Sequence, residues 1–194
     1  MQKDNIRHHI HLHFLVFIAG FTAILGKLIT NSPVSIVWYR MFIALIVIFL
    51  FVAITRKKLK TSYQNILKYA ILGFVISLHW ITFFMSIDYS NVTIALSMMS
   101  TTAFFTSFIE PFFFSRKIIA HELLLSILVI IAIFLILNSE LNYSVGIILG
   151  IFSAFFASIF SVLNGLLIKN EKAYKISFYE FLFGVVFILS LIHI

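Results

Sequence analysis

The sequence predicts an all-α membrane protein, a multi-pass helix bundle, and three observations support this fold class. Hydrophobic residues make up 62% of the chain and charged residues 11%, whereas a soluble domain has about a quarter of its residues charged. The mean hydropathy is +1.11. The apolar residues form long continuous runs, which exclude a membrane β-barrel because a barrel needs short alternating segments.

Each apolar run is expected to form one helix. A helix of about 20 residues crosses a hydrocarbon core of about 30 Å. The first six runs have this length or nearly so, and the seventh reaches the chain end without a flanking polar stop. A polar N-terminal tail, residues 1–13, precedes them. The runs are 12–29, 35–54, 66–87, 92–114, 121–138, 144–168 and 178–194.

Lysine and arginine alternate between the loops that join these runs. The first, third and fifth loops have none. The second, fourth and sixth loops carry, in turn, Arg56, Lys57, Lys58 and Lys60, then Arg116 and Lys117, then Lys169, Lys172 and Lys175. The positive-inside rule therefore predicts a cytoplasmic N-terminus, and the expected location is the plasma (inner) membrane. The net charge of +7 is thus a topology signal, and no nucleic-acid partner is expected.

The second run carries a cation, Arg40, in its first two turns. An arginine costs about +3 kcal/mol at mid-helix and less near a helix end. From Phe42 to Ile54 there are eleven Phe, Ile, Leu or Val residues, each contributing roughly −0.3 to −0.6 kcal/mol, so the segment inserts. Two roles for Arg40 stay open. It would either bind a substrate carboxylate bidentately or anchor the helix at the outer interface by snorkelling.

An internal repeat relates the start of the chain to its end. Gly26 precedes Arg40 by fourteen residues, and Gly165 precedes Glu180 by fifteen. The repeat unit is then five helices, and an odd number of crossings inverts the second copy. We therefore expect a first repeat over 14–138 and an incomplete second repeat over 144–194. Inverted repeats of this kind are a transporter architecture.

The sequence Trp-Tyr-Arg-Met at residues 38–41, with a fourth run rich in serine and threonine, resembles the EamA-type branch of the drug/metabolite transporter superfamily. The resemblance implies ten helices in two inverted halves and export of small metabolites or amino acids. Two departures are visible. The family often has a proline midway along helix 4 and a glutamate at its cytoplasmic end, where this chain has Glu110-Pro111 within the helix and Ser115-Arg116 after it. Helices 8 to 10 have no counterpart here, so the chain is expected to be a fragment, with or without transport activity, or a natural short form.

The fourth run carries a polar stripe. Thr93, Ser97, Ser100 and Ser107 share one helical face, with Phe104 completing the spacing. The four hydroxyl groups would line a solute pathway. In the alternative interpretation, these groups bond carbonyls of their own helix. Pro111 cannot donate a hydrogen bond to the carbonyl of Ser107, which predicts a kink there.

Further candidates lie on the other runs. Glu110 would titrate as a proton-binding carboxylate, or reach the headgroup region near Arg116. His79 and Trp80 would line the cavity or fill a helix interface. Asn164 is the polar group on a seam of small residues in run six, expected to pack tightly against a neighbouring helix. The candidate solute-lining residues are Arg40, His79, Trp80, Ser97, Ser100, Thr101, Glu110 and Asn164.

These features predict an inner-membrane secondary transporter that exports small polar metabolites or amino acids by alternating access. The chain lacks a GxxxxGK[ST] motif, so a gradient would drive transport. The expected partners are a small solute and the lipid bilayer, with homo-oligomerisation left open, and neither enzyme activity nor a cofactor or metal is expected. One alternative is a non-transporting membrane assembly protein. The other is an intramembrane metal-dependent enzyme that uses Glu110 with His8, His9, His11, His13 or His79, although the spacing HExxH is absent.

Overall fold

The computed structural model describes residues 2–137 and 141–192, and within these ranges every regular element is helical. The prediction of an all-α multi-pass membrane protein is confirmed, since six helical segments of the described chain are long and apolar enough to cross a membrane. The elements are α1 (Gln2–Leu28), α2 (Pro33–Ile54), α3 (Tyr63–Tyr89), α4 (Val92–Met99), α5 (Thr102–Phe114), α6 (Ala120–Leu137), a 3₁₀ turn η1 (Leu141–Tyr143), α7 (Ser144–Leu167) and α8 (Ala173–Ile192).

The lengths of two helices differ from the expectation. The last helix begins at Ala173, five residues before the predicted start, and the segment 173–192 is long enough to span. The described apolar part of α6, 120–135, is shorter than the six spanning segments. The first turn of α8 contains the polar residues Tyr174 and Lys175. Hydropathy alone did not assign this turn to the helix, because the continuous apolar run begins only at residue 178.

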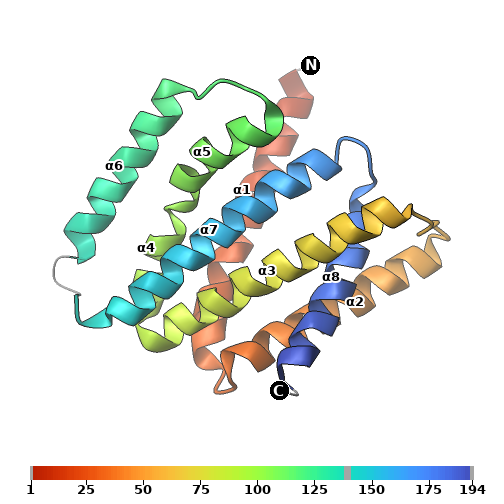
Figure 1. Cartoon of the computed structure of the whole chain (residues 1–194), viewed down its shortest axis with the longest axis horizontal. Coiled ribbons are helices and arrows are strands. Elements are labelled where there is room, and N and C mark those ends of the chain that lie inside the picture. The colour runs from red at the N-terminus through yellow and green to blue at the C-terminus, as the bar shows by residue number, and fades with distance from the viewer. Residues whose placement is uncertain (1, 138–140, 193–194) are drawn as a thin grey trace.

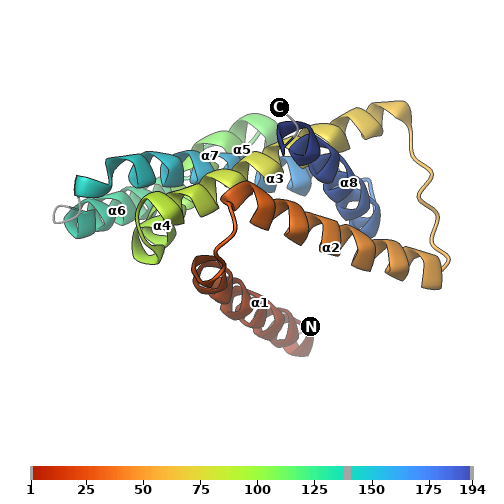
Figure 2. The same ribbon diagram turned by 90° about the horizontal axis from the view of Figure 1, so that it is seen from below.

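The helices α3 and α7 lie side by side at the centre of the bundle (Figure 1). Helices α5 and α6 flank them on one side, and α8 and α2 on the other (Figure 1). Helix α1 diverges from the rest (Figure 2) and is exposed along most of its length. The chain runs through α7 and α8 in the direction opposite to α1 and α2 (Figure 1), as an inverted repeat requires. The repeat itself stays a prediction.

Capping residues set the starts of α2 and α4. The hydroxyl of Ser32 accepts a hydrogen bond from the backbone N–H of Ser35 at 3.3 Å, and Pro33 occupies the first helical position, where its missing N–H costs nothing. The side chain of Asn91 accepts from the N–H of Ile94 at 2.9 Å. These caps follow tight turns that reverse the chain between neighbouring helices.

The fourth apolar run is interrupted at Ser100 and Thr101, which separate α4 from α5, about three turns before the expected kink. The backbone N–H of Thr101 bonds the carbonyl of Met98 at 3.0 Å, and its hydroxyl bonds the same carbonyl at 2.6 Å. This shift to i−3 bonding tightens the turn and ends α4. Helix α5 continues through Pro111 to Phe114.

Part of the predicted small-residue seam of α7 packs tightly. Gly146, Gly150 and Ala154 are buried, whereas Ser161 is exposed. A Cβ atom at Gly150 would lie 2.6 Å from the Cβ of Met98 on α4. The Ser86 hydroxyl of α3 donates to the carbonyl of Gly146 at 2.7 Å. The first half of α7 therefore packs closely against α3 and α4.

A second close approach joins α3 to α8 at Gly73, and we expect Gly73→Ala to destabilise the fold. Its Cβ would lie 2.6 Å from the carbonyl oxygen of Glu180 and 2.8 Å from the backbone nitrogen of Gly184. Because both are backbone atoms, the helices must move apart, at a cost of about 1–3 kcal/mol in the free energy of unfolding. Thermal unfolding in detergent, followed by circular dichroism, measures the effect.

The matched control is Gly20→Ala on α1. A Cβ there meets nothing within 4 Å, so alanine gains helix propensity, worth up to about 1 kcal/mol, without a clash. Equal melting temperatures for the two variants would contradict the close approach of α3 and α8.

Candidate functional site

A cavity of about 390 Å³ lies between α2, α3, α7 and α8. Most of its wall is apolar, and four of its side chains are polar or amphipathic. Arg40 also faces a neighbouring, more open hollow along α2, which shares Arg40, Ala44 and Phe181 with the cavity. An apolar pocket with a few convergent polar groups is the usual form of a small-molecule site. The four side chains are Arg40, Trp80, Asn164 and Glu180.

The guanidinium of Arg40 rests on aromatic rings. Its central carbon lies 4.2 Å from the centroid of the Trp80 ring and 5.4 Å from that of Phe84. Within the described chain, Arg40 has no hydrogen bond or ion pair, and its side chain is exposed. The ring contacts stabilise the cation but leave its N–H donors free. Arg40 can therefore bind an anionic group that enters the cavity.

Glu180 faces the same cavity from α8 and is only 4% exposed. The side-chain amide of Asn164 on α7 donates to its carboxylate at 3.4 Å. No ion pair joins Glu180 to another described residue. A carboxylate inside a membrane helix is expensive, and it marks a functional site by default.

Glu180 was not among the candidate residues predicted from the sequence. A signal was present, because the predicted internal repeat would align Glu180 with Arg40. The two charges occupy corresponding positions of α2 and α8, and these helices pack against each other. The alignment with Arg40 in the predicted repeat thus points to Glu180 more clearly than the local sequence around Glu180 does.

The adjacent residues His79 and Trp80 face in different directions. Trp80 lines the cavity. His79 is 7% exposed, and its Nδ1 lies 3.0 Å from both the carbonyl oxygen and the hydroxyl of Ser153 on α7. The Ser153 hydroxyl also donates to the carbonyl of His79 at 3.0 Å. His79 therefore joins α3 to α7 and lies outside the cavity lining.

The predicted hydroxyl residues of the fourth run also lie outside this cavity. Ser100 is exposed and its hydroxyl donates to the carbonyl of Leu96 at 3.4 Å, while Thr101 is buried. Ser97 is half-buried. A different hydroxyl, Thr106, reaches Ser158 on α7 at 3.0 Å. The described bonds of Ser100 and Thr101 are those of the alternative interpretation, in which hydroxyls bond their own helix.

Comparison with protein families identifies the chain. The family model described as "EamA-like transporter family" matches residues 10–138, more than half of the sequence. The chain belongs to the EamA-like transporter family. The resemblance noted from the sequence is thereby confirmed, and membership indicates a membrane transporter rather than an enzyme. Neither the curated proteins nor the solved structures gave a match.

In this EamA-like transporter, Glu110 lies in a separate groove of about 450 Å³ between α5 and α6. Its carboxylate lies 3.0 Å from Arg116, which also pairs with Glu122 at 3.0 Å. The hydrogen bonds to Glu110 and then to Glu122 raise the pKa of Arg116 above its ordinary value. Arg116 thus links the end of α5 to the start of α6 and holds Glu110 away from the cavity that contains Arg40.

Four of the five histidines of the enzyme alternative lie on one helix of the EamA-like transporter. His8, His9, His11 and His13 lie on the exposed beginning of α1. Within the described residues, no three His, Cys, Asp or Glu side chains form a group that would hold a metal ion.

A carboxylate in the turn between α7 and α8 gives the EamA-like transporter an expected acid dependence. The hydrogen bond from Lys175 is the main cause that lowers the pKa of Glu171 from its ordinary value of 4.5, and the charge of Lys175 and a weaker contribution from the Asn65 hydrogen bond add to it. A lowered folded-state pKa means that this stabilisation is complete above about pH 4.5 and is lost as the pH falls through the folded value. We expect Glu171→Gln to lower the melting temperature at pH 7 by about 2–4 °C, with the difference vanishing at low pH.

Thermal unfolding between pH 7 and pH 3 measures this dependence. Asp88→Asn is the matched control, because Asp88 is exposed and forms no ion pair in the described chain. If the melting temperatures of the native protein and Glu171→Gln depended on pH in the same way, the ionised carboxylate of Glu171 would not stabilise the fold.

Proposed function

We propose that this EamA-like transporter exports a small polar metabolite or amino acid across the plasma membrane, and that the cavity between α2, α3, α7 and α8 is its solute site. The observation that carries the proposal is that one cavity is lined by both a free guanidinium, Arg40, and a buried carboxylate, Glu180. A cation and an anion held apart in an apolar wall suit a solute that carries both charges.

Each polar group in the cavity has a role in this proposal. Arg40 binds a solute carboxylate through two parallel N–H donors. Glu180, oriented by Asn164, accepts a hydrogen bond from a solute ammonium or hydroxyl group. Trp80 holds Arg40 in place and contacts the apolar part of the solute. The volume of about 390 Å³ is within the range of small-molecule sites.

Alternating access would expose this cavity to each side of the membrane in turn. The cavity lies where α2 and α3 of the first predicted repeat, 14–138, meet α7 and α8 of the second, 144–194. Rocking of one repeat against the other then opens one face and closes the opposite face. In the proposed orientation the N-terminus and the basic loops are cytoplasmic, so export begins with the cavity open to that side. A solute or ion gradient supplies the energy.

Counterflow in proteoliposomes tests the proposal. Purified protein is reconstituted into vesicles loaded with an unlabelled amino acid or organic acid, and uptake of the labelled solute is measured for a panel of both classes. We expect at least one solute with a carboxylate to exchange faster than in empty vesicles. If no solute of the panel exchanges faster than in vesicles lacking the protein, transport is rejected in favour of a non-transporting assembly role.

A further inference from the structure

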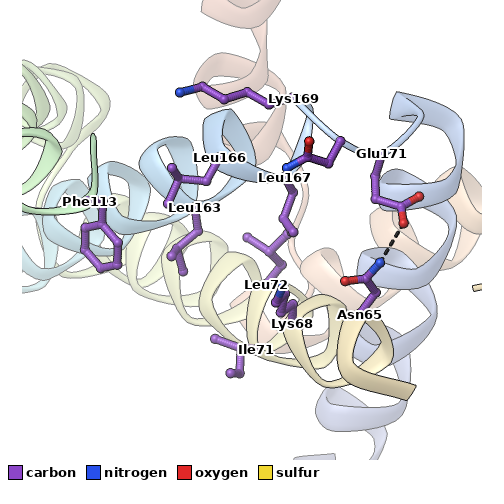
Figure 3. A pocket seen from close by; sticks show the side chains of 11 residues that line it. Asn65, Lys68, Ile71, Leu72, Phe113, Leu163, Leu166, Leu167, Lys169 and Glu171 are labelled. Atoms are coloured by element: carbon purple, nitrogen blue, oxygen red, sulfur yellow. Dashed lines mark hydrogen bonds between the residues drawn. The ribbon is translucent and has the colours of Figure 1, made fainter. Parts of the chain in front are cut away.

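A second cavity lies at the end of the bundle that carries the basic loops. It has a volume of about 410 Å³ and opens between the first turns of α3, the end of α5, and the end of α7 with the turn that follows it (Figure 3). It is separate from the solute cavity and shares none of its lining residues. The apolar side chains of its floor are Ile71, Leu72, Phe113, Leu163, Leu166 and Leu167.

The rim of this cavity has an excess of positive charge. Lys68 is exposed and has no hydrogen bond or ion pair within the described chain. The ammonium of Lys169 lies 4.2 Å from the centroid of the Phe114 ring and has no carboxylate partner among the described residues. The one acidic residue of the rim, Glu171, is bonded by Asn65 at 2.6 Å and by Lys175 at 3.0 Å. Its charge is therefore compensated, and the two lysines remain.

Figure 3 shows Lys169 and Lys68 on opposite sides of the leucine side chains of the floor. A ligand with only a charged group would contact the lysines but leave the floor wet. A purely apolar ligand would fill the floor but leave the lysines unused. The lining therefore suits an amphiphile with an anionic head and a hydrocarbon chain.

The position of the rim along the helices agrees with such a ligand. The loop after α2 meets α8 at this end, because the hydroxyls of Tyr174 and Tyr179 donate to the carbonyls of Lys58 and Leu59 at 3.2 and 3.0 Å. The basic loops thus gather at one end of the bundle, which the positive-inside rule assigns to the cytoplasmic leaflet. Basic pockets between membrane helices on that side bind anionic lipid headgroups.

We propose that this cavity binds an anionic phospholipid of the cytoplasmic leaflet. Lys68 and Lys169 attract the phosphate-containing headgroup, and an acyl chain lies along Ile71, Leu163 and Phe113. The lipid contacts α3, α5 and α7 together, so it links helices of the two predicted repeats. The proposal does not depend on the identity of the transported solute.

Native mass spectrometry of the full chain, released from detergent after titration with lipid, tests the site. Phosphatidylglycerol is compared with phosphatidylcholine of the same acyl chains, and we expect the anionic lipid to bind at least tenfold more tightly. The double variant Lys68→Gln/Lys169→Gln is expected to lose about 30-fold in affinity for phosphatidylglycerol, since each basic residue near the membrane surface contributes about fivefold.

Two further variants separate the cavity from general surface attraction. Lys58→Gln/Lys117→Gln removes the same charge from exposed lysines of the same end, outside the cavity, and is expected to bind as the native protein does. Leu166→Trp narrows the floor without changing the charge, and is expected to weaken lipid binding. Circular dichroism confirms that each variant is folded.

Three outcomes would overturn the proposal. The first is equal affinity for phosphatidylglycerol and phosphatidylcholine. The second is an equal loss of affinity for phosphatidylglycerol in the two double lysine variants. The third is displacement of the lipid by excess inorganic phosphate together with native affinity in Leu166→Trp, which would indicate a phosphate site without an acyl chain.

Discussion

Replacing Arg40 by alanine is expected to reduce solute exchange about 100-fold while the protein still inserts and folds. The side chain contacts the rings of Trp80 and Phe84, and losing such contacts costs about 0.5–1 kcal/mol of stability at an exposed site. Two charge-assisted hydrogen bonds to a solute carboxylate are worth about 1.5–3 kcal/mol each. Transport should therefore fall far more than stability, as measured by counterflow and thermal unfolding of the same preparation.

Arg40→Lys separates the two roles left open for this residue. A lysine snorkels as well as an arginine but presents no bidentate fork. We expect intermediate transport if Arg40 binds the solute, whereas an interfacial anchor predicts native transport. Lys27→Ala is the matched control, since Lys27 is an exposed cation at the end of α1, outside the cavity. Native exchange by both Arg40 variants would remove Arg40 from the solute site.

Glu180→Gln is expected to lower the exchange of amino acids at least tenfold and to leave the fold intact or more stable. Glutamine keeps the shape of the side chain of Glu180, which is 4% exposed. It also removes the cost of burying an unpaired charge, because an uncompensated charge is expensive in an apolar environment. The lost interaction is a charge-assisted hydrogen bond to the solute ammonium, worth about 1.5–3 kcal/mol.

The measurement compares solutes that differ only in the amine. The ratio of exchange rates between an amino acid and the corresponding carboxylic acid should fall in Glu180→Gln, because only the amino acid uses Glu180. Glu122→Gln serves as the control, since that carboxylate pairs with Arg116 in the groove between α5 and α6. An unchanged ratio in Glu180→Gln would show that Glu180 does not contact the solute amine.

Much of the architecture was predictable from the sequence because the bilayer imposes a strong constraint. A membrane segment must be helical and apolar over about 20 residues, so hydropathy places helices such as 35–54 within a few residues of their observed bounds. The same constraint makes a charge within a long apolar run conspicuous, and for that reason Arg40 was identified. Trp80 and Asn164 were also predicted as lining residues, and both lie in the cavity with Arg40.

The sequence by itself determined which segments are helices and singled out Arg40 as a charge within one of them, but it did not single out Glu180. Only the tertiary structure decided which residues meet. Close contacts at Gly73 and Gly150 set how α3 and α7 turn toward their neighbours, and this rotation directs Trp80 into the cavity and His79 toward Ser153. The partners lie far apart in the chain, and local periodicity reports only the apolar face of each helix. When a helix is apolar on all sides, its sequence periodicity does not indicate which side contacts which neighbouring helix.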